Sequence, residues 1–378
     1  MTTTTNNEQK KLNVPNLRFK EFQGEWITYK IKDVLSIGNG RDYKHLNNGG
    51  IPVFGTGGYM TSVDECLYDG ETTFIGRKGS INKPFYYNGK FWTVDTLFYT
   101  HSFNGITPKF TYCLFQTINW LKYNEASGVP SLSKDTIEKI KINIPGLEEQ
   151  NKIAKLMFAL DERITTQNKI IEDLKKLKSA IIEKHYSRVK KQTTYIADLG
   201  EAFSVGSLAK DDLAEIGNPC VIYGELFTTY GEIIFHIESY TNKTDGMILS
   251  KKGDLLFPSS TTVDAMSLIA PSVINVDGVV LGGDMFGIHI SHNYNAQYLS
   301  YYFNHIAKKQ LAKFTKGSTI IHLHYTDIEK AKLLLPSLEE QNRMAKCLVA
   351  LDKKISVEQN LLSLLICQKS YLLQQMFI

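Results

Sequence analysis

The sequence contains no long apolar run. None of its segments approaches the roughly 18 consecutive apolar residues that a membrane-spanning helix needs. The polar start, from Met1 to Lys11, also lacks the order of a secretion signal, in which positive charge precedes an apolar stretch. We therefore expect a cytoplasmic protein without a membrane partner.

Cysteine is scarce as well. The chain has five cysteines, widely spaced and without a CxxC pair: Cys66, Cys113, Cys220, Cys347 and Cys367. This spacing does not match the usual zinc or redox motifs. We interpret the five residues as buried thiols.

The motifs of common enzymes are missing. There is no Walker loop and no zinc-protease helix. Phe54-Gly-Thr-Gly-Gly58 lacks the strand–turn–helix context of a cofactor-binding turn, and Asn218-Pro-Cys-Val221 lacks the second proline and the aromatic residue of an amino-methyltransferase motif. His322-Leu-His324 has no third metal ligand nearby. The sequence therefore favours a binding role, with no metal or cofactor in this chain.

What is present is the composition of a folded protein. The chain has 378 residues, of which 43% are hydrophobic and 22% charged, so we expect two domains with cores of their own. The formal net charge of +4 permits a local nucleic-acid-binding patch but does not establish one.

An internal repeat is the strongest signal. Pro145-Gly-Leu-Glu-Glu-Gln-Asn aligns with Pro336-Ser-Leu-Glu-Glu-Gln-Asn at an offset of 191, and 12 of the 20 positions from Pro145 to Ile164 are identical. Unrelated segments would share about one or two. Looser similarities, such as Ile31-Lys-Asp33 with Ile196-Ala-Asp198, extend the repeat upstream at drifting offsets. The chain is a divergent front module followed by a well-kept segment, twice.

The well-kept segments predict two long helices of about 40 residues, each about 60 Å long at 1.5 Å per residue. Apolar residues recur at the a and d positions of a heptad, with no Pro or Gly from Glu148 to about Tyr186. We expect an antiparallel coiled coil paired through Met157, Leu160, Ile164, Ile171, Leu174, Ile181, Leu348, Leu351, Ile355, Leu362, Leu365 and Leu372.

Two seam positions are polar in both copies: Gln167 with Glu358, and Lys178 with Lys369. A shared polar layer fixes register because it penalises slipped pairings. A solvated notch between the helices is an equally good explanation at this point.

The front modules predict mixed α/β domains. Short β-type runs such as Thr72-Thr-Phe-Ile75 and Val279-Val-Leu281 alternate with glycine-rich loops, and short helices are expected over 107–120 and 295–314. The expected architecture is mixed α/β with a pseudo-twofold repeat: a tail at 1–15, modules at 16–145 and 188–335, and spacer helices at 146–187 and 336–378.

The loops of both modules carry glycine, hydroxyl and basic residues, which suit DNA. Glycine lets the backbone approach a phosphate, Arg can contact guanine O6 and N7 together, and hydroxyls accept or donate to several base edges. The candidate DNA contacts are Arg41, Tyr59, Arg77, Lys78, Ser80, Ser131 and Lys134 in the first module, and Ser259, Ser260, Thr261, Lys316, Ser318, Thr319 and His322 in the second.

These features together resemble the specificity subunits of type I restriction-modification systems. The repeated Pro-x-Leu-Glu-Glu-Gln-Asn lead into a long helix carries the resemblance, with the opening Asn13-Val-Pro-Asn-Leu-Arg-Phe-Lys-Glu-Phe and Gly24-Glu-Trp26. Gly76-Arg-Lys-Gly-Ser80 resembles a motif of that family's target-recognition domains, where the second module has Pro258-Ser-Ser-Thr instead.

The resemblance implies that each module reads half of a split, asymmetric DNA target while the helices set the gap. It also implies two methyltransferase subunits with S-adenosylmethionine that methylate adenine N6, and nuclease-translocase subunits that use ATP and Mg²⁺. Two alternatives stay open: a stand-alone DNA-cleaving or DNA-modifying enzyme with divergent motifs, and a coiled-coil protein whose modules bind protein.

Overall fold

The computed structural model describes residues 13–378, so most of the predicted tail at 1–15 lies outside the described residues. The chain divides into two compact units. Unit 1 combines the chain up to Asn168 with Asn360–Ile378, and unit 2 is Lys169–Gln359. Each unit therefore contains one α/β module and a part of both long helices.

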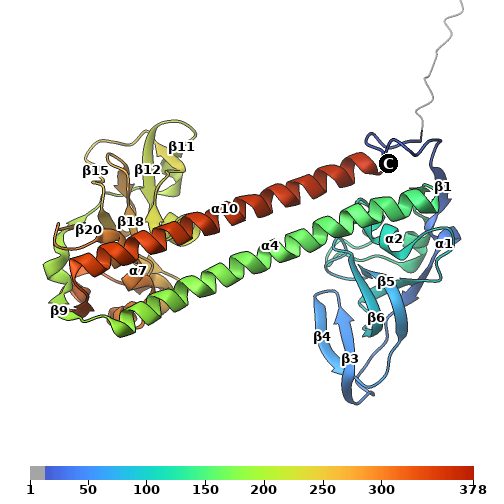
Figure 1. Ribbon diagram of the computed structural model, residues 1–378, viewed down its shortest axis with the longest axis horizontal. Helices are drawn as coiled ribbons and strands as arrows, with labels where there is room; N and C mark the ends of the chain where they lie inside the picture. The colour runs from blue at the N-terminus through green and yellow to red at the C-terminus, as the bar shows by residue number, and fades with distance from the viewer. Residues whose placement is uncertain (1–12) are drawn as a thin grey trace, which may run out of the picture. The chain divides into compact units, whose positions relative to one another are not determined.

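The two predicted long helices are confirmed. They are α4, Leu147–Arg188, and α10, Leu338–Met376, and Figure 1 draws both as continuous helices. Each begins two residues after the proline of the repeat, because the residue before a proline is biased away from helical conformation and the ring cannot continue a helix. Among the described residues, no helix is both long and apolar enough to span a bilayer.

Within each unit the two helices run antiparallel. In unit 1, Met157 near the start of α4 shares a core with Met376 at the end of α10. In unit 2, Ile182 near the end of α4 shares a core with Leu348 near the start of α10. None of the 12 predicted seam residues is exposed: six are buried and six are half-buried.

The lysines that interrupt the seam form the same ion pair in both units. In unit 2, Lys178 Nζ lies 2.9 Å from Asp352 Oδ1; in unit 1, Lys369 Nζ lies 2.5 Å from Asp161 Oδ1. Both pairs connect positions related by the offset of 191, with the roles of the helices exchanged. The lysine side chains are only 12% and 13% exposed, which supports a polar layer rather than a solvated notch.

A glutamine of the repeat ties each helix start to its module. Gln150 Oε1 accepts from the backbone N–H of Thr107 (2.9 Å), and Gln341 Oε1 accepts from that of Asn295 (3.0 Å). Each glutamine Nε2 also donates to the carbonyl of the proline before its helix, at 2.9 Å. Thr107 and Asn295 are the N-caps of the main helix of each module, so one buried side chain connects two helix starts.

The module of unit 1 is built on a six-stranded sheet of order β2-β7-β5-β6-β3-β4. The strands are β2 Ser36–Asn39, β7 Leu97–His101, β5 Tyr68–Gly76, β6 Phe85–Thr93, β3 Asn48–Gly55 and β4 Gly58–Val63. A two-stranded sheet pairs β1, Ile27–Lys30, with β8, Lys141–Ile144. The helices are α1 Ile31–Val34, α2 Pro108–Phe115, η1 Trp120–Tyr123 and α3 Lys134–Lys139.

The sheet of unit 1 curls around aromatic side chains. Phe74 pairs with Phe85 across β5 and β6, and Phe91 lies six residues further along β6, which is about 20 Å in a flat strand. The Phe74 and Phe91 rings nevertheless lie 4.7 Å apart. The strands must therefore be strongly coiled around these rings.

Unit 2 repeats this sheet and adds a second one. Its first sheet has the order β10-β20-β16-β18-β13, with the last pair parallel, as β6 and β3 are in unit 1. These strands are β10 Gly200–Ser204, β20 Met285–Ile290, β16 Asp254–Pro258, β18 Ser272–Ile274 and β13 Ile233–Ile234. The added sheet comprises β11 Leu213–Ala214, β14 Ser239–Thr241, β12 Asn218–Ile222, β19 Val280–Gly282 and β15 Ile248–Leu249.

The remaining elements of unit 2 are two further strand pairs and a set of short helices. β9 Gln192–Tyr195 pairs with β22 Lys332–Leu335, and β17 Ser260–Thr261 pairs with β21 Ile321–His322. The helices are η2 Ile196–Leu199, η3 Lys210–Asp212, α5 Glu225–Thr228, α6 Ala265–Leu268, α7 Ala296–His305, α8 Lys308–Leu311, η4 Ala312–Phe314 and α9 Tyr325–Ile328. The predicted mixed α/β fold is confirmed.

Two predicted helices are shorter than expected. The helix predicted over 107–120 ends at Phe115, because Trp120 folds back and donates its indole N–H to the Phe115 carbonyl (2.9 Å). The helix predicted over 295–314 breaks after His305, where the N–H groups of Ile306 and Ala307 both donate to the Tyr302 carbonyl.

The interpretation of all five cysteines as buried is wrong for three of them. Cys113 and Cys220 are buried, whereas Cys66, Cys347 and Cys367 are exposed. Cys347 and Cys367 occupy α10 outside the predicted seam, on positions that face solvent. Burial raises the pKa of Cys113 to about 12 and that of Cys220 to about 11, so neither buried thiol is a nucleophile at neutral pH.

Candidate nucleic-acid interface

Two loops meet at the predicted recognition site of unit 1. We call them loop pair 1: residues 76–80, which begin at the last residue of β5, and residues 125–132, which precede α3. The Leu132 N–H donates to the Arg77 carbonyl (2.9 Å), and the Gly79 N–H donates to the Pro130 carbonyl (2.8 Å). A β-bridge joins Lys78 and Ser131. Four of the predicted contact residues, Arg77, Lys78, Ser80 and Ser131, are therefore on one local surface.

The same two loops meet in unit 2. Loop pair 2 consists of residues 258–261, which begin at the last residue of β16 and include β17, and residues 316–323, which include β21 and precede α9. The Leu323 N–H donates to the Ser259 carbonyl (2.9 Å), and Ser260 pairs with His322. All seven contact residues predicted for the second module lie on these two loops, but Ser259 and Ser260 are buried, at 4% and 8% exposure.

The two loop pairs share one backbone hydrogen-bond frame. The Arg77 N–H donates to the Thr96 carbonyl (2.8 Å), just before β7, and the Ser259 N–H donates to the Asp284 carbonyl (2.7 Å), just before β20. Glu125 N–H donates to the Ser131 carbonyl (3.0 Å) in the first pair, as Lys316 N–H does to the His322 carbonyl (2.9 Å) in the second. The frame is the same while the side chains differ.

Glycine is required at two points of these loops. A Cβ on Gly76 would lie 2.5 Å from the Ser80 carbonyl oxygen, closer than real Cβ contacts. Gly317 has φ +104, and a Cβ there would lie 2.1 Å from the Ile320 carbonyl oxygen. These positions allow the chain to reverse tightly, because only glycine adopts such turns without strain.

Arg77 is the most constrained of the basic candidates. Its Nη1 donates to the Asp95 carbonyl (3.3 Å), and its guanidinium carbon lies 5.9 Å from the centre of the Phe98 ring. Lys78 and Ser80 are exposed. Lys134 is the first residue of α3, and its Nζ lies 3.6 Å from Glu138. A half-buried, oriented guanidinium beside exposed ammonium groups suits base reading beside phosphate binding.

Arg41 and Tyr59 border loop pair 1 without belonging to it. The Arg41 N–H donates to the Thr93 carbonyl (2.7 Å), so Arg41 lies against the turn at 93–96, which also binds Arg77. Tyr59 is 64% exposed on β4, where its hydroxyl lies 3.0 Å from Ser62 Oγ. Tyr59 pairs with Phe54, whose carbonyl accepts from the Val94 N–H in that turn. Contact of Arg41 and Tyr59 with DNA stays a prediction.

The charges of the two loop pairs differ at equivalent positions. Glu125 in the first pair accepts hydrogen bonds from Thr136 and Ser133, which lower its pKa. Lys316 in the second pair lies 2.5 Å from Asp327 and lowers the pKa of that carboxyl by its hydrogen bond. Lys316 is paired with a carboxylate, whereas Glu125 keeps its negative charge and is held by neutral hydrogen-bond donors.

Sequence reasoning missed the residues that close each loop. Glu125 and Leu132 in unit 1 match Lys316 and Leu323 in unit 2, at the same offset of 191 that relates the long helices. Extending the alignment upstream from the helices would have identified them.

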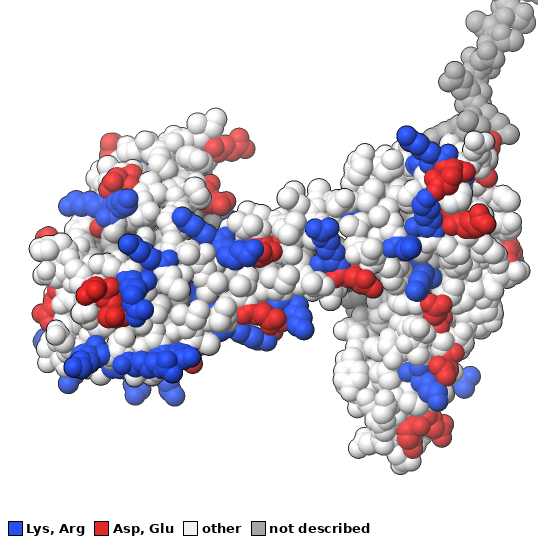
Figure 2. All heavy atoms as spheres, viewed as in Figure 1, with Lys and Arg blue, Asp and Glu red and all other residues white. Residues whose placement is uncertain are grey.

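A basic surface lies on α4 in unit 2. Lys175, Lys176, Lys184 and Arg188 are exposed there, and Figure 2 shows Lys and Arg side chains gathered along the lower edge of that unit. In unit 1, basic and acidic side chains alternate over the face in view (Figure 2). The cluster is local, because unit 2 as a whole has 22 Lys and Arg against 22 Asp and Glu; a local concentration of basic residues suits contact with phosphates.

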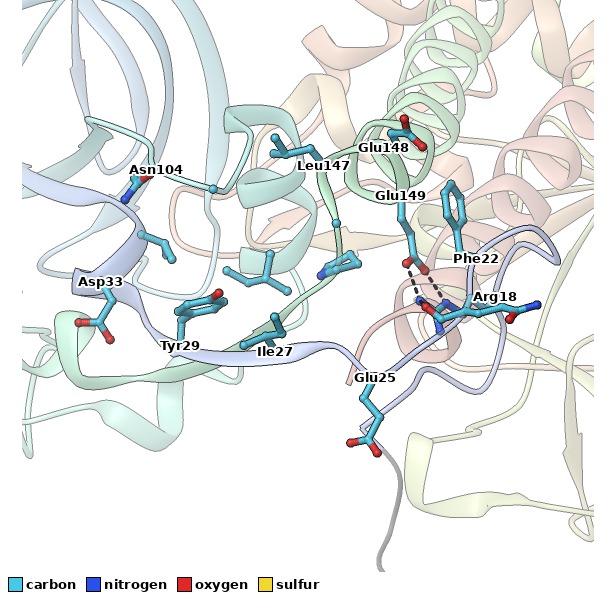
Figure 3. Close-up of a pocket in the computed structure, with 16 residues that line it drawn as sticks. Arg18, Phe22, Glu25, Ile27, Tyr29, Asp33, Asn104, Leu147, Glu148 and Glu149 are labelled. Carbon is cyan, nitrogen blue, oxygen red and sulfur yellow. Dashed lines mark hydrogen bonds and ion pairs between the residues drawn. The ribbon is translucent and has the colours of Figure 1, made fainter.

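A pocket at the start of α4 carries carboxylates, but they serve the fold. Figure 3 shows Glu149 facing Arg18, whose Nε and Nη2 donate to its two carboxylate oxygens at 2.8 and 2.7 Å. Asp33 caps α1 by accepting from the Lys30 N–H (3.0 Å). Across residues 13–378, no cluster of three or more metal-ligating side chains occurs.

Comparisons with known proteins agree with this architecture. Residues 23–176 and 189–365 match the family described as type I restriction modification DNA specificity domain. The type I restriction enzyme MjaVIII specificity subunit of Methanocaldococcus jannaschii is 26% identical over 78% of this chain and 73% of its own length. A putative type I restriction enzyme specificity subunit of Haemophilus influenzae is 24% identical over 80% of each chain.

A solved structure shows the same fold. The S subunit of a type I restriction-modification system from M. genitalium aligns with a TM-score of 0.70 at 15% sequence identity, covering 97% of this chain and 99% of its own. The family match covers most of the chain and falls once on each α/β module with its following helix. The chain belongs to the type I restriction-modification DNA specificity family, as its repeated motif predicted.

Proposed function

We propose that the chain reads a two-part DNA target, with loop pair 1 contacting one half-site and loop pair 2 the other. The observation that carries this proposal is the shared backbone frame with unlike side chains. Where loop pair 1 has Arg77 and Lys78, loop pair 2 has the buried Ser259 and Ser260, and its exposed candidates are Lys316, Ser318 and Thr319. Because base edges are read by side chains, the two half-sites differ and the target is asymmetric.

The chain acts within a restriction-modification complex, in keeping with its family. Two methyltransferase subunits carry S-adenosylmethionine and methylate adenine N6, and restriction subunits supply ATP- and Mg²⁺-dependent cleavage. These cofactors bind the partners, and the chain contributes sequence choice. Because the proposed target is genomic DNA, we propose that the chain acts in the cytoplasm.

Methylome sequencing tests this function. Host cells with the gene should show N6-methyladenine at one two-part motif with a fixed gap, and cells lacking the gene should lose that motif entirely. If the motif persists without the gene, the chain is not the sequence reader. Purified chain alone, incubated with DNA and Mg²⁺, should neither cleave nor methylate; turnover there would instead support a stand-alone enzyme.

A further inference from the structure

An exposed apolar side chain stands at the tip of each recognition loop. Val129 is 67% exposed and Ile320 is 49% exposed. Single apolar residues on a surface are ordinary, but these two are related by the offset of 191. The same exposed position is therefore apolar and β-branched in both modules, although the neighbouring residues have diverged.

The fold does not need these side chains. The loops use a different apolar residue for packing: Leu132 is 3% exposed and Leu323 is fully buried. Three residues before each leucine, Val129 and Ile320 extend away from the core. Exposing these apolar side chains to water is unfavourable, and no packing within the protein offsets this. Contact with a ligand therefore explains their presence better than a role in stability does.

Both tips lie beside the predicted base-reading residues. In unit 1, the Pro130 carbonyl next to Val129 accepts from the Gly79 N–H (2.8 Å), two residues after Arg77. In unit 2, Ile321 next to Ile320 pairs with Thr261. The loop necks are closed by the equivalent hydrogen bonds of Glu125 and Lys316, so each tip is held at a defined place on the recognition surface.

We infer that Val129 and Ile320 each contact the 5-methyl group of a thymine, one in each half-site. Thymine is the base that presents a methyl group in the major groove, and apolar side chains recognise it there. A β-branched side chain is stiff at χ1, so little conformational freedom is lost on contact. The inference rests on the proposed function and assigns specificity to two residues beyond the polar candidates.

Uracil substitution in the DNA tests the inference directly. The complex of this chain with its methyltransferase partners is titrated with the methylome-derived target, in which each half-site thymine on either strand is replaced singly by deoxyuridine. This change removes one methyl group and preserves base pairing. Burial of one methyl corresponds to about fourfold in affinity, so one thymine in each half-site should show a loss of that size.

The variants should remove this response one half-site at a time. Val129→Ala should bind thymine and uracil versions of the first half-site equally while still discriminating in the second, and Ile320→Ala should do the reverse. Leu121→Ala is the matched control, because Leu121 is 54% exposed in the same module and has no exposed apolar counterpart at the offset of 191. It should leave both responses intact.

Three results would overturn the inference. Wild-type complex could bind every uracil-substituted target as well as the thymine target; Val129→Ala could weaken binding to all DNA alike; or a half-site could contain no A·T pair. In each case the two-part methylation motif persists, so the proposed function stands. The gene-deletion comparison tests the proposed function separately, and only persistence of the motif without the gene would contradict that function.

Discussion

Arg77 is the residue that most clearly separates loop pair 1 from loop pair 2. Its side chain is held between the Asp95 carbonyl and the Phe98 ring, whereas the equivalent Ser259 is nearly buried, at 4% exposure. An oriented guanidinium can contact guanine O6 and N7 together, and a serine cannot. The difference between the half-sites should therefore be largest at the base that Arg77 faces.

Arg77→Ala should relax the first half-site and leave the second unchanged. Loss of a bidentate base contact costs about 1–3 kcal/mol of discrimination, so additional bases should appear at one position of the methylation motif. Methylome sequencing of cells expressing the variant checks this. Lys78→Ala is the comparison: as a phosphate contact it should weaken methylation at all sites alike. An unchanged motif in Arg77→Ala would remove Arg77 from the base-reading set.

At the scale of the elements, the polar layer of the helix pair is joined to the module of unit 2. Lys178 Nζ lies 2.9 Å from both Asp352 Oδ1 and Glu232 Oε1, and His305 Nε2 also lies 2.9 Å from that Glu232 oxygen. Burial alone would raise the pKa of Glu232, but the hydrogen bonds from His305 and Lys178 and the lysine charge hold it at about 2. In unit 1, Lys369 has one carboxylate partner, Asp161, and the amide of Gln116.

Lys178→Met should destabilise unit 2 more than Lys369→Met destabilises unit 1. Removing one partner of a buried ion pair costs about 3–5 kcal/mol, and Lys178 leaves two carboxylates without their cation. Urea unfolding at pH 7 measures both losses. Lys176→Met, at a side chain 70% exposed, is the surface control; an equal loss there would mean that the buried layer contributes nothing special.

Lys178→Met should also change how the stability of unit 2 depends on pH in acid. The pKa of Glu232 is lower in the folded protein than the ordinary value of about 4.3, so the carboxylate stabilises the fold above that pH and loses this contribution as the pH falls toward 2. Without Lys178 the folded pKa is less depressed. The acid-induced loss of stability in Lys178→Met should then be smaller over this range, on top of the lower stability at pH 7.

The elements differ in how well the sequence predicted them. The helices α4 and α10 followed from apolar periodicity, which is a local signal, and their seam residues are at least half-buried as expected. The contact between Arg77 and Leu132 could not be predicted from the sequence. It joins two loops far apart in the chain through backbone atoms, which carry no sequence signature. The only sequence signal of the added sheet in unit 2 was the changing offset between similar segments of the two modules.

At the scale of the whole molecule, we expect the two long helices to set the gap between the half-sites. A two-headed reader reaches one face of the duplex most easily when its half-sites are about one helical turn, or 34–36 Å, apart. Both helices are continuous, at 42 and 39 residues. Helix length is thus expected to correspond to a number of base pairs.

Insertion of one helical turn into both α4 and α10 should lengthen the gap in the methylation motif and preserve both half-sites. Each turn adds about 5.4 Å, which is between one and two base pairs at about 3.4 Å each. Methylome sequencing gives the gap directly. A single-helix insertion is the control and should disrupt the seam. Altered half-sites with an unchanged gap would contradict a spacer role for the helices.

The composition of unit 1 from two distant stretches has a consequence for synthesis on the ribosome. Trp26 and Phe110 pack against Phe377, the penultimate residue of the chain, with ring centres 6.2 and 5.4 Å away. Unit 2 is one uninterrupted stretch. The core of unit 1 therefore needs a segment synthesised about 270 residues after Phe110, whereas unit 2 needs no residue beyond Gln359, so truncation before Phe377 should destabilise unit 1 and spare unit 2.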